Sequence, residues 1–125
     1  LLTGDPRGAG LSDAAYRTAE GGLEHLALYR VAAPAVALRA MAPRFTTIAS
    51  VARGGVAPEA LPRGKPFALV LGNEETGLAP ATAAACAHRV TLPGSGRVES
   101  LNVSAAAAVL IHALDRIAGG RSPEA

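Results

Sequence analysis

Short apolar runs alternate along the chain with segments whose apolar residues recur at helical spacing. Continuous apolar runs are typical of strands in parallel sheets that are buried on both faces. The expected strands are 1–3, 23–31, 45–51, 67–71 and 88–92. The expected helices are 12–20, 34–41, 80–87 and 102–118. This alternation predicts an α/β fold, with a mostly parallel sheet and helices on both of its faces.

Gly and Pro mark the ends of these elements. Pro34 opens one expected helix and Pro43 ends it, while two glycines follow the longest helix, 102–118. Residues 53–66 are rich in Gly and Pro and predict a loop. The helix 102–118 is apolar nearly all round until Asp115. We therefore expect it to be buried.

The composition limits the chain to one domain. Its 125 residues allow one hydrophobic core, and half of them are hydrophobic although only two Tyr and two Phe are present. No apolar run reaches the roughly 18 residues of a membrane span, and no signal peptide pattern is present. The lone Cys86 excludes a disulfide within the chain and fits a reducing, cytoplasmic setting.

The positive charge is carried almost entirely by arginine. Eleven Arg stand against one Lys, and the net charge is +2. Arginine pairs well with phosphate oxygens, so RNA is one interpretation and the codon bias of a GC-rich genome is the other. Four arginines are candidates for RNA contact: Arg30, Arg44, Arg53 and Arg63. The alternative is that they are ordinary solvated side chains.

Two segments follow expected strands, and ligands of open α/β sheets bind at the carboxyl ends of strands. The first, LVLGNEETGL (residues 69–78), runs from a buried strand into Gly72, where the backbone can approach a ligand closely. Asn73 and Glu74 come next, and Gly77 allows a turn. An ordinary strand-to-helix turn is the alternative.

The second segment, LPGSGRVESLNVS (residues 92–104), joins a strand to the amino end of a helix. Such an end offers free N–H groups and a positive dipole. Ser100 or Asn102 is also a plausible N-cap. The loop suits a phosphate, a nucleoside or no ligand, so the pattern predicts a site without naming what binds there.

These two segments resemble the second and third signature motifs of the SpoU/TrmH family of the SPOUT superfamily. YRTAEGGLEH (residues 16–25) also resembles a small-residue segment of the family. The resemblance implies a methyltransferase that transfers a methyl group from S-adenosylmethionine to a ribose 2′-hydroxyl of tRNA or rRNA. It further implies a deep trefoil knot at the carboxyl end and a homodimer. Residues 1–120 would form this SPOUT-type domain, with 121–125 as a C-terminal tail.

The same resemblance implies the site residues, with contacts to the cofactor made largely by backbone. The cofactor-binding residues would be Leu71, Gly72, Asn73, Leu92, Pro93, Gly96, Ser100 and Leu101. The catalytic residues, which organise the site and the acceptor, would be Glu74, Ser100 and Asn102. A ribose hydroxyl is a poor nucleophile that must lose its proton as it attacks, and in-line positioning provides much of the acceleration. No metal is implied.

One departure from the family concerns its first motif, which carries the arginine thought to activate the hydroxyl. That motif is not in this sequence, and Arg17 lacks its context. Because the chain starts with what looks like the end of a strand, we expect it to begin inside a larger domain. The alternative function is a non-catalytic module that binds RNA and S-adenosylmethionine. A Rossmann dinucleotide enzyme is disfavoured because no G-x-G-x-x-G follows an early strand.

The other polar residues that invite attention have ordinary interpretations. His25, His88 and His112 lack the spacing of a metal site, and Cys86 is expected to be a small buried side chain. Glu99 is expected to be solvated or paired with Arg97.

Overall fold

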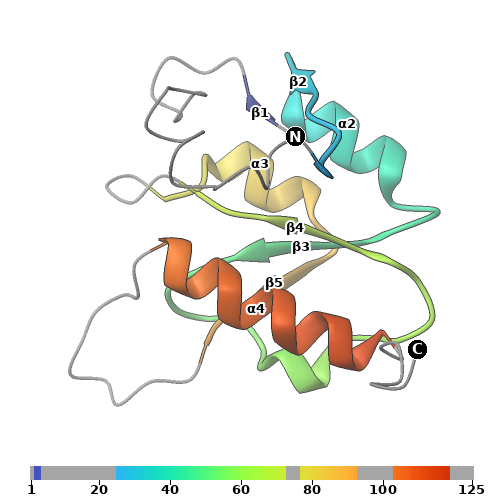
Figure 1. Ribbon diagram of the computed structural model, residues 1–125. Helices are drawn as coiled ribbons and strands as arrows, with labels where there is room; N and C mark the ends of the chain where they lie inside the picture. The colour runs from blue at the N-terminus through green and yellow to red at the C-terminus, as the bar shows by residue number, and fades with distance from the viewer. Residues whose placement is uncertain (1, 4–24, 73–76, 93–102, 119–125) are drawn as a thin grey trace. The chain divides into compact units, whose positions relative to one another are not determined.

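A computed structural model describes residues 2–3, 25–72, 77–92 and 103–118 (Figure 1). Along the chain the elements are β1 (Leu2–Thr3), β2 (Arg30–Val31), α2 (Pro34–Met41), β3 (Thr46–Ser50), the 3-10 helix η2 (Pro58–Ala60), β4 (Phe67–Val70), α3 (Pro80–Ala85), β5 (His88–Val90) and α4 (Val103–Ile117). Most expected elements are therefore confirmed, with ends that differ by one or two residues. The expected helix 12–20 lies outside the described residues.

The chain divides into two compact units, Leu1–Pro34 and Ala35–Ala125. In the first unit β1 pairs with β2 in parallel, with Leu2 opposite Arg30. The prediction of a buried strand over 23–31 is wrong, because the strand covers only Arg30–Val31 and residues 25–30 are exposed. Apolar residues on both faces predict a strand that is covered on both faces, and the described part of this unit provides no such cover.

The second unit contains a three-stranded parallel sheet with the order β4-β3-β5. The register places Ile48 of β3 opposite Leu69 of β4 on one side and His88 of β5 on the other. Figure 1 shows α3 on one face of the sheet, and α4 together with η2 on the opposite face. The predicted α/β architecture, a parallel sheet covered on both faces, is confirmed for this unit.

The central strand β3 is buried along most of its length. Its β-branched residues suit a pleated surface, and successive side chains point to opposite faces. Ile48, with no exposed surface, points into the main hydrophobic core. Thr47 points to the other face, where its hydroxyl accepts the backbone N–H of Ala87 at 2.9 Å. That hydrogen bond compensates for the burial of the Thr47 hydroxyl in the central strand.

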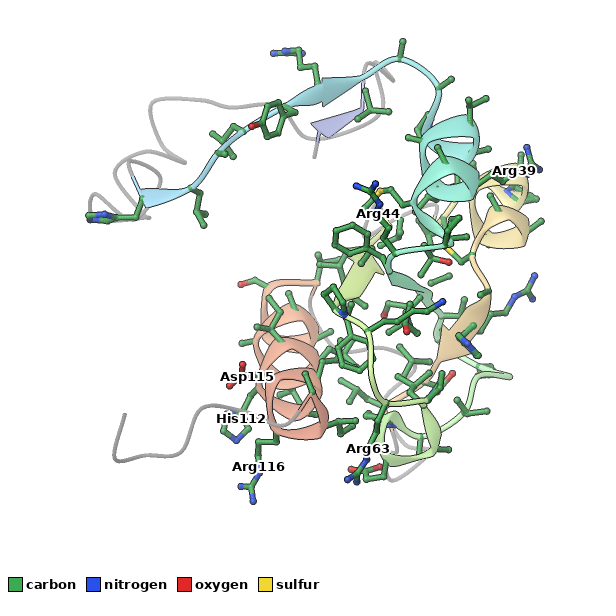
Figure 2. All side chains as sticks on the ribbon, turned by 90° about the vertical axis from the view of Figure 1, so that its right-hand side faces the viewer. Arg39, Arg44, Arg63, His112, Asp115 and Arg116 are labelled. Carbon is green, nitrogen blue, oxygen red and sulfur yellow. The ribbon has the colours of Figure 1, made fainter. Side chains whose placement is uncertain are left out.

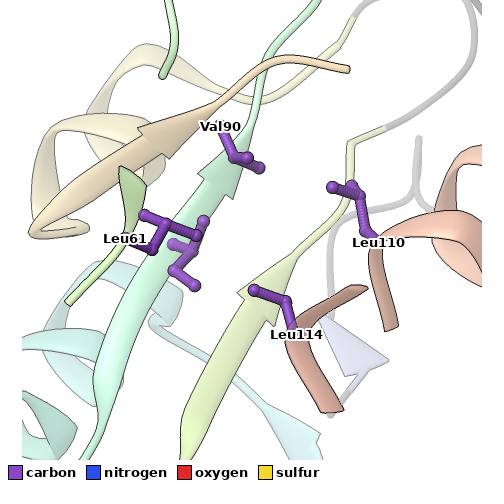
Figure 3. Close-up of a cluster of buried hydrophobic side chains, with 5 residues drawn as sticks. Leu61, Val90, Leu110 and Leu114 are labelled. Atoms are coloured by element: carbon purple, nitrogen blue, oxygen red, sulfur yellow. The ribbon is translucent and has the colours of Figure 1, made fainter. Parts of the chain in front are cut away.

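The main core joins the sheet to α4 and to the connection between β3 and β4. Its buried side chains, drawn in Figure 3, are Ile48, Leu61, Val90, Leu110 and Leu114. Leu61 follows η2, a helical turn that the prediction of a plain loop over 53–66 missed. Partly buried side chains from the edges of the sheet pack against this cluster: Phe67, Leu69, Leu71 and Leu92.

The expectation that α4 is buried all round is wrong. Leu110, Leu114 and Ile117 form its buried stripe, at the spacing of one helical face. On the two flanks of this stripe, Val109 is 50% exposed and Ile111 is 59% exposed. A helix that lies on one face of a sheet has only one stripe covered by that sheet. No helix among the described residues is long and apolar enough to cross a membrane.

The core makes a direct prediction about stability. Leu110 is 1% exposed, so Leu110→Ala leaves a cavity between α4 and the sheet. We expect a loss of about 2–5 kcal/mol of unfolding free energy. Val36 on α2, 64% exposed, is the matched control, and Val36→Ala should change the value by less than about 0.5 kcal/mol. Urea unfolding followed by circular dichroism measures both; equal midpoints for the two variants would contradict this core.

Candidate functional site

The carboxyl ends of β4, β3 and β5 open at the same edge of the sheet, because all three strands are parallel. Leu71 and Gly72 follow directly after β4, and Leu92 follows two residues after the end of β5. In Figure 1 these strand ends lie on the left, and α4 starts on the same side. The fold therefore brings the segments that carry the predicted site residues to one edge.

Leu71 and Leu92 contribute their side chains to the fold. Both are partly buried and pack against the main core. Their side chains are therefore committed to packing, and what remains for a ligand at these two positions is chiefly the backbone N–H and C=O. This agrees with the expectation of backbone contacts to a cofactor, although the contacts themselves stay a prediction.

Gly72 lies in close contact with its own chain. A Cβ at this position would lie 2.5 Å from the carbonyl carbon of Gly77 and 2.5 Å from the backbone nitrogen of Leu78. Gly77 has a φ of +68°, in the left-handed region that favours glycine, and it allows the turn that brings the chain back. The sequence predicted a close approach at Gly72, and in the structure the backbone that approaches is its own.

The end of β3 lies between the ends of β4 and β5, so the loop 51–56 that follows it belongs to the same edge, although no motif in the sequence predicted this. After β3 the loop 51–56 folds against β5, where the backbone N–H of Val51 donates to the carbonyl of Val90 and that of Val56 to the carbonyl of Arg89, both at 2.9 Å. The available signal was the pair Gly54 and Gly55 in the short segment that follows a buried strand, a signal similar to that of Gly72 after β4.

Most of the predicted site residues lie outside the described part of the chain. These residues, which fall within 73–76 and 93–102, are Asn73, Glu74, Pro93, Gly96, Ser100, Leu101 and Asn102. Each of the two segments starts where a strand has just ended, after Gly72 and after Leu92, and the second runs directly into α4. Their roles stay predictions.

Cys86 is the one cysteine of the chain, and it lies in the described part of the structure. The Cys86 thiol donates to the carbonyl of Thr82 at 3.6 Å. Burial raises the pKa of this thiol above its ordinary value, while the charge of Arg89 acts in the opposite sense. A thiol that stays protonated is a weak nucleophile, which supports the structural interpretation of Cys86. Among the described residues, no three His, Cys, Asp or Glu side chains gather as metal ligands.

The relatives found by comparison with known proteins are named as RNA methyltransferases. A 33% identical relative is the "Uncharacterized tRNA/rRNA methyltransferase slr0955" of Synechocystis, matched over 94% of this chain and 31% of that protein. Another, 34% identical, is the "23S rRNA (guanosine-2'-O-)-methyltransferase RlmB" of Acinetobacter baylyi, matched over 85% of this chain and 44% of that protein. The chain thus spans less than half the length of either relative.

Among solved structures, the SpoU methyltransferase AviRb from Streptomyces viridochromogenes, in complex with the cofactor AdoMet, has a TM-score of 0.69 and 28% identity. The likeness covers 86% of this chain and 43% of that one. The model of the SpoU rRNA Methylase family matches residues 1–112, which include β1 to β5 and most of α4. With a match over nearly its whole length, this chain belongs to the SpoU rRNA methylase family.

Proposed function

We propose that this chain is the S-adenosylmethionine-binding part of an enzyme that methylates ribose 2′-hydroxyl groups of tRNA or rRNA. The observation that carries the proposal is the placement of Leu71, Gly72 and Leu92 at the same carboxyl edge of a parallel sheet. Family membership gives this edge its chemistry: one relative is named as a guanosine 2′-O-methyltransferase of 23S rRNA, and a similar solved structure contains AdoMet.

The described residues fit such a cofactor. Leu71 and Leu92 are anchored in the core through their side chains, so their backbone groups are held in place before a ligand arrives. Gly72 lies directly against the backbone of Gly77 and Leu78. S-adenosylmethionine supplies a methyl group on a positively charged sulfur. Leu71, Gly72, Asn73, Leu92, Pro93, Gly96, Ser100 and Leu101 would bind and orient it.

The acceptor side of the reaction belongs to polar residues in the two segments that follow β4 and β5. A ribose hydroxyl must give up its proton as its oxygen attacks the methyl carbon. Glu74, Ser100 and Asn102 would organise the acceptor so that this oxygen lies in line with the bond that breaks. These roles rest on the family resemblance, and each residue is placed by its position in the signature motifs.

The fold selects among the arginines that are candidates for RNA contact. Arg44 precedes β3 and Arg63 precedes β4, so both lie on the side where the strands begin, which faces the viewer in Figure 2. Arg53 instead follows β3, in the exposed part of the loop 51–56 at the carboxyl edge. A cation at that edge is positioned to hold an RNA phosphate while the neighbouring ribose reaches the cofactor. Arg53 is therefore our proposed RNA contact.

The proposal includes a homodimer, a knotted carboxyl end and a cytoplasmic location. The exposed apolar side chain of Ile111 on α4 supports a dimer, because a second copy could remove it from water. The knot rests on the family resemblance. Residues 1–120 would form the methyltransferase domain, with 121–125 as its tail.

Cofactor binding is tested by titration calorimetry on the whole protein. S-adenosylmethionine should bind the unaltered protein, and NAD should not. Gly72→Ala should raise the Kd for S-adenosylmethionine at least about tenfold, because a Cβ 2.5 Å from the backbone of Gly77 forces the turn to move. The matched control is Gly64→Ala, strained by a φ of +109° but in open space before β4, which should leave that Kd unchanged. Tight NAD binding without S-adenosylmethionine binding would refute the proposal.

Catalysis is tested on the full-length protein that contains this chain, with Asn102→Ala and a radiolabelled methyl donor on tRNA and rRNA. Turnover should fall about 100-fold or more, while the fold and the Kd for S-adenosylmethionine stay the same. Wild-type turnover in this variant would contradict the role of Asn102. If the unaltered protein binds both ligands without transferring a methyl group, the non-catalytic binding module replaces the enzyme.

The RNA contact is tested with Arg53→Gln. The KM for RNA should rise about tenfold, and the slope of log affinity against log salt should fall by about one phosphate contact. Arg63→Gln, at the opposite edge of the sheet, is the matched control and should leave both values near those of the wild type. Equal effects of the two variants would show that the arginines act only through overall charge.

A further inference from the structure

The hydroxyl of Thr91 lies between two parts of the loop 51–56. The backbone N–H of Gly55 donates to the Thr91 oxygen at 2.9 Å. The same hydroxyl donates its proton to the carbonyl of Val51 at 3.0 Å. One side chain at the end of β5 thereby closes the loop that follows β3.

Backbone hydrogen bonds join the same two segments on either side of that hydroxyl. Val51 donates its N–H to the carbonyl of Val90 at 2.9 Å, and Thr91 donates its own to the carbonyl of Val56 at 3.0 Å. The ladder between β3 and β5 reaches Ser50 and Val90. These contacts continue the connection beyond that point, so the chain leaving β3 and the chain leaving β5 are held as one unit.

Gly55 makes this arrangement sterically possible. A Cβ on Gly55 would lie 2.6 Å from the carbonyl carbon of Val90, and 2.7 Å from both the backbone nitrogen and the hydroxyl oxygen of Thr91. Two of these three atoms are backbone atoms that cannot turn away. The close approach at Gly55 and the two hydrogen bonds of Thr91 are therefore parts of the same contact.

We propose that Thr91 is a positioning residue for the cofactor site: by clamping the loop 51–56 onto the end of β5, it fixes the backbone that continues into Leu92. This inference rests on the proposed function, because Leu92 is a cofactor-binding residue only there. The side chain of Leu92 is held by the core, and the residue before it is held by the clamp. A backbone held by both the core and the clamp is pre-organised, so cofactor binding loses less conformational entropy.

Loss of the hydroxyl acts on two partners at once. Without it, the N–H of Gly55 and the carbonyl of Val51, both in partly buried residues, lose their hydrogen bonds. Partly buried groups left without a partner move to reach water, and that movement loosens the loop and the segment next to it. The effect on cofactor affinity is therefore indirect, through the backbone.

A purely structural role would lower stability without changing affinity, and the chain provides a matched control for it. Thr47 also lies in a strand region of this sheet, and its hydroxyl accepts the N–H of Ala87 at 2.9 Å. It lies on β3 near the start of the strand, away from the carboxyl edge. Thr47→Val removes one hydroxyl from the same type of hydrogen bond, but leaves the clamp intact.

The experiment measures the Kd for S-adenosylmethionine by calorimetry and the unfolding midpoint in urea, both on the whole protein. Thr91→Val should raise the Kd about tenfold, which corresponds to one lost net interaction of a usual size. Thr91→Ser keeps the hydroxyl and should return the Kd to within about twofold of the wild type. Thr47→Val should lower the unfolding midpoint and leave the Kd unchanged.

The inference is overturned if Thr91→Val lowers the midpoint but binds S-adenosylmethionine like the unaltered protein. If Thr91→Val does not fold, Thr91→Ala removes the hydroxyl without adding a methyl group and gives the same comparison with Thr91→Ser. Failure of the unaltered protein to bind S-adenosylmethionine is a different result, and it refutes the proposed function itself.

Discussion

The structure of the larger unit depends on one strand being buried on all sides. β3 pairs in parallel with β4 and with β5, and its Ile48 and Thr47 point into the layers on opposite faces. Parallel pairing forces the three carboxyl ends to one edge, and burial on both faces forces the helices to cover the sheet. The position of the candidate site follows from these two requirements before any polar residue is considered.

At that edge the chain relies on backbone rather than on large side chains. Leu71 and Leu92 use their side chains for the core, and the turns after β3 and β4 are tight enough to exclude a Cβ at Gly55 and Gly72. The composition agrees with this construction, because the chain has few aromatic residues and many glycines and alanines. A site of this type draws its precision from how firmly its loops are tied to the sheet, which gives the two hydrogen bonds of Thr91 their importance.

The sequence predicted those elements whose pattern is set by local neighbours. The apolar runs at β3 and β4 and the Pro that opens α2 predicted these elements to within a few residues. The errors arose where burial depends on distant parts of the chain: the apolar segment 23–31 is exposed, and α4 is covered on one stripe only. An amphipathicity pattern reports which surfaces favour burial, whereas topology decides which of them are covered.

The candidate site shows the same division. Motifs predicted Gly72 and Leu92 as site residues, because glycine after a buried strand and a strand that ends in a Pro-Gly loop are visible locally. Thr91 was not identified, since its partners Val51 and Gly55 are 40 and 36 residues away in sequence. An isolated threonine in a strand has no sequence signal for such a contact, which depends on β5 lying next to β3.

The close packing of Gly72 shows that a signature motif contains residues needed for the fold as well as residues needed for catalysis. Any residue with a Cβ is excluded there by the backbone of Gly77 and Leu78, whether or not a cofactor is bound. A descendant of this family that had lost its chemistry would still need glycine at this position to keep this local backbone arrangement. Gly72 therefore reports ancestry and architecture, and the decision between an enzyme and an inactive relative lies with the polar residues of the signature motifs, Asn102 among them.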